Sequence, residues 1–218
     1  MKKYIYAIIA LFTLSLTILS GSALAVKNSQ EAVIHLQKDW AIANYQLKDK
    51  PQEEAFIKLM AEADEYVKQF PSDASVLIWR GIILSTFAGV EGGLGALKYA
   101  KASKADLEKA LGLQPDALDG GAYTSLGALY YKVPGWPISF GDDDKAQMLL
   151  EKGLSVSPAG IDSNYFYADF LIGEDHYKKA KEYLQRALNA APRPGREVAD
   201  EGRRKEIRAA LAEVEDNL

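Results

Sequence analysis

The sequence predicts an all-α solenoid of about four helical hairpins with a C-terminal capping helix, and three observations predict it. Apolar residues recur at spacings of three and four over most of the chain, as they do on one face of a helix. Prolines interrupt these patterns at Pro71, Pro115, Pro158 and Pro192. Small residues stand at matching distances before the prolines, where they would allow two helices to pack closely.

The hairpin between Asn164 and Pro192 is the clearest of the four. Two amphipathic segments flank a short polar turn, and the second segment ends at Pro192. Ala168, in the first segment, lies 12 positions before Ala180 in the second. Small and leucine residues lie 12, 8, 5 and 4 positions before the proline: Ala180, Leu184, Ala187 and Leu188. The sequence therefore predicts a close helix–helix contact at the small residues.

The same template accounts for the rest of the chain. It predicts hairpins at about residues 29–71, 73–115, 119–158 and 161–192, and a solvating capping helix at about 196–216. The terminating prolines are 44, 43 and 34 residues apart. The last interval equals the period of about 34 residues of a tetratricopeptide repeat (TPR). We therefore predict one TPR-like domain over residues 26–218.

Two insertions lengthen the second and third hairpins. Relative to the fourth hairpin, ten extra residues fall in 88–102 and seven in 133–143, and both stretches lie where a hairpin turns. Repeat proteins often carry such added loops on one functional face. The glycines of 89–95 do not follow a phosphate-loop or dinucleotide-binding spacing, so a flexible turn is expected there.

The first 25 residues have the pattern of a secretory signal peptide. Lys2 and Lys3 precede an apolar run from Tyr4 to Leu19, and a small-residue cleavage pattern ends at Ala25. These sixteen apolar residues are short for a bilayer span of about 20, so cleavage after Ala25 is favoured over a retained anchor. We expect a periplasmic protein with no stable membrane insertion after leader cleavage.

The composition argues against several kinds of site. The 218 residues include no cysteine, and the formal charge of −4 becomes −6 without the two leader lysines. An acidic chain is a poor candidate for binding nucleic acid. Without cysteine there is no disulfide, no thiolate metal site and no lipid acceptor. His35 and His176 lack a partner histidine at metal spacing and are expected to be solvated. We therefore predict no catalytic residue, no metal and no cofactor, and no enzymatic activity.

Three consecutive carboxylates at residues 142–144 suggest a cation site, because carboxylates bind hard cations. A calcium loop that began at Asp142 would need glycine at its sixth position and an acid at its twelfth. The sequence has Gln147 and Gly153 there. The favoured interpretation is a helix N-cap followed by two acids in the first turn.

The loop Pro134–Phe140 is the more informative of the insertions. Its two prolines stiffen the backbone, which lowers the cost of ordering Trp136 and Phe140. Exposed aromatic loops on rigid scaffolds often contact partners. In the alternative, Trp136 and Phe140 fold back and plug the edge of the hairpin.

The concave wall is the second candidate site. In stacked hairpins the first helix of each pair lines this wall, and the spacing from the small residues predicts its members: Ile78, Ile82, Ser85, Thr124, Ala128, Tyr131, Tyr165, Asp169 and Ile172. Apart from Asp169 and the neighbouring Lys132, the predicted wall is apolar and aromatic. It therefore favours an apolar ligand or a helical partner segment, unless the terminal helix closes the inner face.

Three segments resemble a known family. They are YYKVPGWPISFGD (Tyr130–Asp142), PAGIDSNYFYADFL (Pro158–Leu171) and APRPGREVADEGRRKEI (Ala191–Ile207). Together they are similar to the TatT-type periplasmic components associated with TRAP transporters, over most of the chain from Pro71 onward. The resemblance implies an all-helical TPR-like protein that partners a TRAP substrate-binding protein and holds a hydrophobic ligand in an internal passage. It also implies self-association into a homo-oligomer. The absence of cysteine departs from the lipoprotein members of that family.

The leading functional hypothesis is therefore a non-enzymatic periplasmic binding or adaptor protein with a protein partner. The alternative is a stand-alone carrier of a small hydrophobic ligand in the apolar concave groove.

Overall fold

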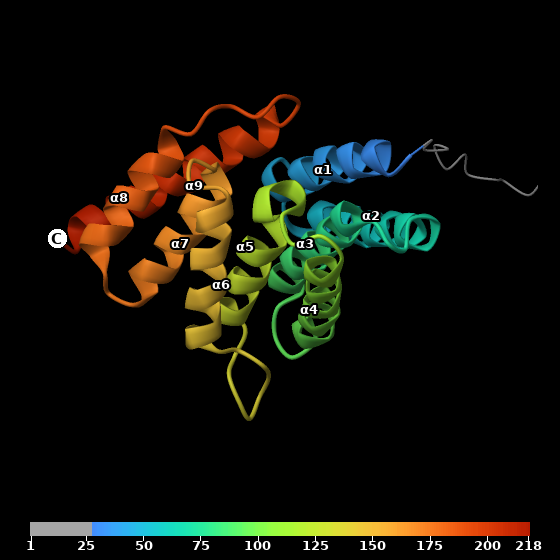
Figure 1. Cartoon of the computed structure of the whole chain (residues 1–218), viewed down its shortest axis with the longest axis horizontal. Helices are drawn as coiled ribbons and strands as arrows, with labels where there is room; N and C mark the ends of the chain where they lie inside the picture. The colour runs from blue at the N-terminus through green and yellow to red at the C-terminus, as the bar shows by residue number, and fades with distance from the viewer. Residues whose placement is uncertain (1–27) are drawn as a thin grey trace, which may run out of the picture.

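The computed structural model describes residues 28–218 (Figure 1). The predicted leader, residues 1–25, and its cleavage after Ala25 lie outside the described residues. Within residues 28–218 the chain forms nine α-helices and no β-strand: α1 (Ser29–Tyr45), α2 (Asp49–Gln69), α3 (Ala74–Glu91), α4 (Ala96–Leu113), α5 (Ala117–Lys132), α6 (Asp143–Val156), α7 (Ile161–Gly173), α8 (Tyr177–Leu188) and α9 (Glu197–Asp216). The predicted all-α solenoid of helical hairpins with a C-terminal capping helix is confirmed.

The helices form two layers that curve around a common interior. Each odd-numbered helix from α1 to α7 pairs with the helix that follows it, and consecutive odd-numbered helices also contact one another. The odd-numbered helices therefore form the inner layer. The last helix, α9, packs on α7 and α8 and also reaches α1, so the end of the solenoid returns to its beginning (Figure 1).

Small residues set the distance between paired helices, as the template predicts. A Cβ atom on Gly127 of α5 would lie 2.7 Å from Cγ of Leu150 on α6. In the second hairpin the Ser103 hydroxyl donates a hydrogen bond of 2.7 Å to the Gly81 carbonyl. Ala168 and Ala187 are fully buried. These residues therefore lie between the helices and away from solvent.

Helix α3 is the central helix of the core. Of the helices described, it alone is long and apolar enough to cross a membrane, and 56% of its residues are buried in the fold. It contacts α1, α2, α4 and α5, so its apolar surface meets protein on several sides. Its composition is therefore explained by its place in the core.

The two insertions have different structures. The first mostly lengthens α3 and α4 to 18 residues each, and only residues 92–95 form the turn between them. Gly92 and Gly93 have positive φ there, a conformation that glycine adopts at little cost. Gly89, predicted to lie in the turn, belongs to α3. The second insertion is a true loop that spans residues 133–142.

Asp142 caps α6 as predicted. Its carboxylate accepts a hydrogen bond of 3.0 Å from the backbone N–H of Lys145, and Asp143 and Asp144 stand in the first turn. At α5 the first turn is irregular: residues 118–120 have φ values of 50°, 54° and 72°. Regular helix therefore begins only after Gly120, and Leu118 and Asp119 are directed toward the interior of the solenoid.

Candidate functional site

The inner layer lines a partly open cavity of about 510 Å³. Helices α1, α3, α5 and α7 contribute to its wall, and the segment from Arg193 to Arg203 completes it. Sites for small organic ligands commonly have volumes of about 300–1,000 Å³. The concave surface is thus narrowed by the terminal helix to a space that suits a small molecule better than a helical segment of a partner.

Five of the nine predicted wall residues line this cavity, Ser85 among them. Ile78 and Ile82 contribute from α3, and Thr124 and Ala128 from α5. Ile78 is fully buried and Thr124 is 5% exposed, so both form the floor of the cavity. Their part in binding stays a prediction. The structure does bring them together on one wall, as the spacing from the small residues predicts.

The other four predicted wall residues lie outside the cavity lining. Tyr131 packs edge-on against Phe170, and Asp169 forms an ion pair of 2.8 Å with Lys132. Tyr165 lies under the guanidinium of Arg203 at 4.4 Å. Ile172 is half-buried against the core.

For the three of these residues that belong to α7, the reason is the rotation of that helix. The residues that face the cavity from this helix are Asp162, Ser163 and Phe166, which share one face at helical spacing. The face of Tyr165, Asp169 and Ile172 is rotated away from it. The prediction for this helix was therefore wrong in its phase, by one residue.

Three arginines gather at one end of the cavity: Arg193, Arg196 and Arg203. Arg193 donates hydrogen bonds to Asp162 (2.6 Å) and to Asp200 (2.7 Å). Arg203 donates to Asp162 (2.8 Å) and to Glu206 (2.6 Å). The prediction that the charged residues of the terminal helix face solvent is wrong for Asp200, which is 3% exposed, and for Arg203, which is 8% exposed.

Burial and this network of charges shift the pKa values of the side chains around it. Burial by itself would raise the pKa of Asp162, but the charges of Arg203 and Arg193 outweigh it and hold the pKa well below its ordinary value of 3.8. Burial raises the pKa of Tyr165 to about 12, against the opposing effect of Arg203. Burial, and then the charge of Arg193, lowers the pKa of Arg196.

Arg196 differs from its neighbours because no carboxylate lies within ion-pair distance of its guanidinium, although Asp162 and Asp200 are near enough to stabilise its charge. It forms no ion pair with any carboxylate of residues 28–218, and its Nε has no hydrogen-bond acceptor there. Its guanidinium lies over the ring of Trp79 at 5.0 Å. The indole Nε1 of Trp79 is also buried without an acceptor in the described part of the chain. At this end of the cavity, therefore, two buried N–H groups have no hydrogen-bond acceptor in the described part of the protein.

The two predicted roles of the Trp136 loop, partner contact and plugging of the hairpin edge, fall to different aromatic residues. Trp136 is 90% exposed. Phe140 folds back, with its ring edge-on to Tyr130 at 5.5 Å. The neck of the loop is closed by a hydrogen bond of 3.0 Å from the Gly141 N–H to the Pro134 carbonyl. The loop is thus anchored at Phe140 and presents Trp136 to solvent.

Further apolar side chains are exposed on this loop and on the turn between α3 and α4. Ile138 in the same loop is 58% exposed, and Leu94 in the turn between α3 and α4 is 81% exposed. Both turns lie at the lower edge of the solenoid in Figure 1, since α3 and α5 run side by side in the same direction. We call Leu94, Trp136 and Ile138 the apolar edge.

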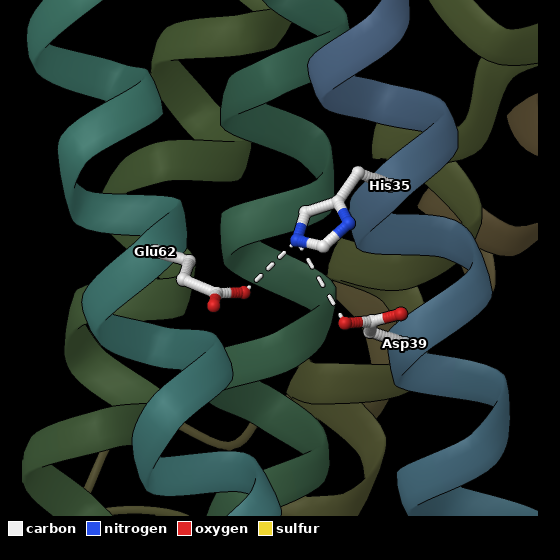
Figure 2. A group of neighbouring side chains, drawn as sticks. All are labelled: His35, Asp39 and Glu62. Carbon is white, nitrogen blue, oxygen red and sulfur yellow. Dashed lines mark hydrogen bonds and ion pairs between the residues drawn. The ribbon is translucent and has the colours of Figure 1, made fainter. Parts of the chain in front are cut away.

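His35, Asp39 and Glu62 form a cluster between α1 and α2 (Figure 2). His35 Nε2 shares a hydrogen bond of 3.0 Å with Glu62 Oε2 and lies 3.7 Å from Asp39 Oδ2. One ligand atom from each residue lies within 4.8 Å of the others, so the cluster could hold a metal ion. The expectation of a solvated His35 was wrong, because its side chain is 24% exposed and joins two helices. His176 is exposed as expected.

The sequence pattern did not identify several residues of the cavity lining. Trp79 and Phe166 are neighbours of the predicted wall positions, and the arginines belong to the predicted solvated cap. One signal was present: Arg196 and Arg203 are seven residues apart, and this spacing places both on one face of a helix. That this face turns inward depends on the contact of α9 with α1 and α7, which no local pattern reveals.

No family model matches the chain, and no curated protein matches it by sequence. Solved structures do resemble it. A thermophilic TPR protein of Thermus thermophilus, TTC0263, superimposes with a TM-score of 0.55 at 18% identity, and the match covers 83% of this chain and 80% of that one. MamA (residues 41 to the end) of Desulfovibrio magneticus RS-1 gives a TM-score of 0.44 at 16% identity, over 85% of this chain and 94% of that one. The first likeness supports the TPR-like fold, so the chain is an all-α, TPR-like solenoid.

Proposed function

We propose that the protein is an exported, non-enzymatic adaptor that docks a protein partner on its apolar edge. The observation that carries the proposal is the exposure of Trp136, which is 90% accessible on a loop held at both ends. Tryptophan is among the residues that contribute most to protein–protein interfaces. A TPR-like solenoid supplies a rigid support for such a loop.

The partner that we propose is a TRAP-type substrate-binding protein. The support for it is the similarity of residues 130–142, 158–171 and 191–207 to the TatT-type components. Two of these segments form the sites described above: the first contains the Trp136 loop, and the last contains the cavity arginines. Export to the periplasm, directed by the leader, would bring the two proteins into one compartment.

A second function is favoured by a separate observation, the cavity of about 510 Å³. Its walls include Ile78, Ile82 and Phe166. We propose that the protein carries a small, largely hydrophobic molecule there. The two functions are compatible, because the apolar edge lies on hairpin turns whereas the cavity lies inside the solenoid.

Native mass spectrometry of protein purified from its source tests both functions. We expect a complex with a TRAP-type substrate-binding protein if the adaptor function holds, and a bound lipid-like mass if the carrier function holds. Trp136→Ser should weaken the protein complex by about thirtyfold, as for an interface hot spot of about 2 kcal/mol. It should leave the bound small molecule in place.

Ile57→Ser is the matched control for the apolar edge. Ile57 is 51% exposed on α2, away from the two turns, so its replacement should leave the complex intact. Equal loss in both variants, or no loss with Trp136→Ser, would contradict docking on the apolar edge. A dimer in place of a complex with a different protein would show that the edge joins two copies of this chain.

A further inference from the structure

We propose that the cavity binds an organic anion with one acidic group and an apolar chain, such as a medium-chain carboxylate, and that Arg196 recognises the acidic group. This inference rests on the carrier function and names the chemical class of its ligand. It departs from the sequence-based expectation of a purely apolar ligand, because the arginines of the cavity come from the terminal helix and the loop before it and not from the hairpins.

The first argument is the distribution of charge among the three arginines. Arg193 and Arg203 are held by three carboxylates, those of Asp162, Asp200 and Glu206. Arg196 lines the same cavity and lacks an ion pair within the described chain. It is therefore the arginine whose charge is available to a ligand.

The second argument is the environment of Arg196. A buried or half-buried charge is stable only when a counter-charge or hydrogen bonds replace its hydration. The ring of Trp79 provides a contact at 5.0 Å, but a ring face is not an acceptor for the N–H groups in the plane of the guanidinium. A carboxylate would supply both the negative charge and acceptor oxygens, in a geometry that matches the guanidinium fork.

The third argument is the nature of the remaining wall. Ile78, Ile82 and Phe166 are apolar, so a ligand that is charged along its whole length would leave its other charges without partners. The carboxylates of Asp119 and Asp162 also line the cavity and would repel additional negative groups. Lys132, which is the cationic side chain of the lining besides the three arginines, is already paired with Asp169 at 2.8 Å. A single acidic group attached to an apolar chain fits these constraints.

Isothermal titration calorimetry with decanoate and with 1-decanol tests the inference. The two probes have the same nine-carbon tail and differ in the head group, which is an anionic carboxylate in one and an uncharged hydroxymethyl group in the other. We expect the purified, lipid-stripped protein to bind decanoate at least about tenfold more tightly, since a hydrogen-bonded ion pair contributes more than one tenfold step in affinity. Arg196→Gln should remove this preference and leave the affinity for 1-decanol unchanged.

Arg186→Gln is the matched control. Arg186 also lies over an aromatic ring, that of Tyr183 at 4.8 Å, but it is exposed on α8 and does not line the cavity. This variant should keep the wild-type preference for decanoate. Circular dichroism verifies that both variants are folded, and the comparison of the two probes on the unmodified protein needs no variant.

The outcomes separate the inference from the function on which it rests. Equal affinity for decanoate and 1-decanol overturns the recognition of an anion, while the carrier function stands. Binding of neither probe overturns both. A preference for decanoate that survives Arg196→Gln overturns the assignment of Arg196.

Discussion

At the scale of single residues, the fold depends on positions where no side chain fits. Gly127 of α5 faces Leu150 of α6, and an added Cβ would approach Leu150 Cγ to 2.7 Å and its backbone nitrogen to 3.0 Å. The backbone nitrogen cannot move without shifting α6 itself. The close approach of the two helices therefore requires glycine at this position.

We predict that Gly127→Ala lowers the free energy of unfolding by about 1–3 kcal/mol, as in other cases of overpacking in a core. Urea denaturation followed by circular dichroism measures the loss. Gly89→Ala is the control, because Gly89 is exposed in α3 and an added Cβ there meets nothing within 4 Å. That variant should gain up to about 1 kcal/mol from helix propensity. If both variants gain stability, the close packing of α5 on α6 is wrong.

At the scale of elements, the terminal helix is tied to the array by charge as well as by its buried apolar residues Ile207 and Val214. Asp162 at the start of α7 accepts hydrogen bonds from Arg193, in the loop before α9, and from Arg203 of α9. A carboxylate shared by two guanidinium groups links three segments that are distant in sequence. The interaction can be tested by pH, because Asp162 is ionised in the folded state at lower pH than in the unfolded chain.

We predict that Asp162→Asn destabilises the protein at pH 7 and that the difference from wild type shrinks as the pH falls below about 4. The arginines lower the pKa of Asp162 in the folded state from its ordinary 3.8, so its contribution is complete above that value. The contribution is lost as the pH falls toward the lowered pKa. Urea denaturation at pH 7 and at successive values down to pH 3 measures the difference.

Asp116→Asn provides the comparison for this pH series. Asp116 is exposed before α5, and its side chain makes no capping hydrogen bond. Its replacement should change stability little at any pH. A constant difference between Asp162→Asn and wild type across the series would show that the ion pairs do not hold α9 against α7.

The sequence was sufficient to predict the helices and their pairing. It was not sufficient to predict which face of each helix turns toward the cavity. The spacing of prolines and small residues correctly predicted the hairpins and the burial of Ala168 and Ala187 between helices, because both are set by local sequence. It could not show that the first insertion lengthens α3 and α4, since a glycine-rich stretch is compatible with a turn or with helix ends. The phase of α7 was wrong because Tyr165 and Phe166 are adjacent and both aromatic, so the local pattern does not decide which of them lines the cavity.

At the scale of the whole molecule, the solenoid closes on itself. Helix α9 contacts α1, and the Tyr45 hydroxyl donates a hydrogen bond of 3.3 Å to Glu206 across this contact. An open TPR-like array would expose a groove for an extended or helical partner. Closure turns the groove into a cavity and brings the arginines to its wall, so the binding properties of the interior depend on a contact between the two ends of the described chain.

We predict that Gly202→Val opens this closure. A Cβ on Gly202 would lie 2.4 Å from the ring of Tyr45, so a valine must separate α9 from α1. Hydrogen–deuterium exchange should become faster in both helices, while α5 and α6, which do not contact either of them, keep their protection. Ala209→Val places the same side chain at an exposed position of α9 and should leave exchange unchanged. Decanoate affinity should fall with Gly202→Val, because the cavity loses the wall that carries Arg196; unchanged exchange in α1 would mean that the two ends of the solenoid do not support one another.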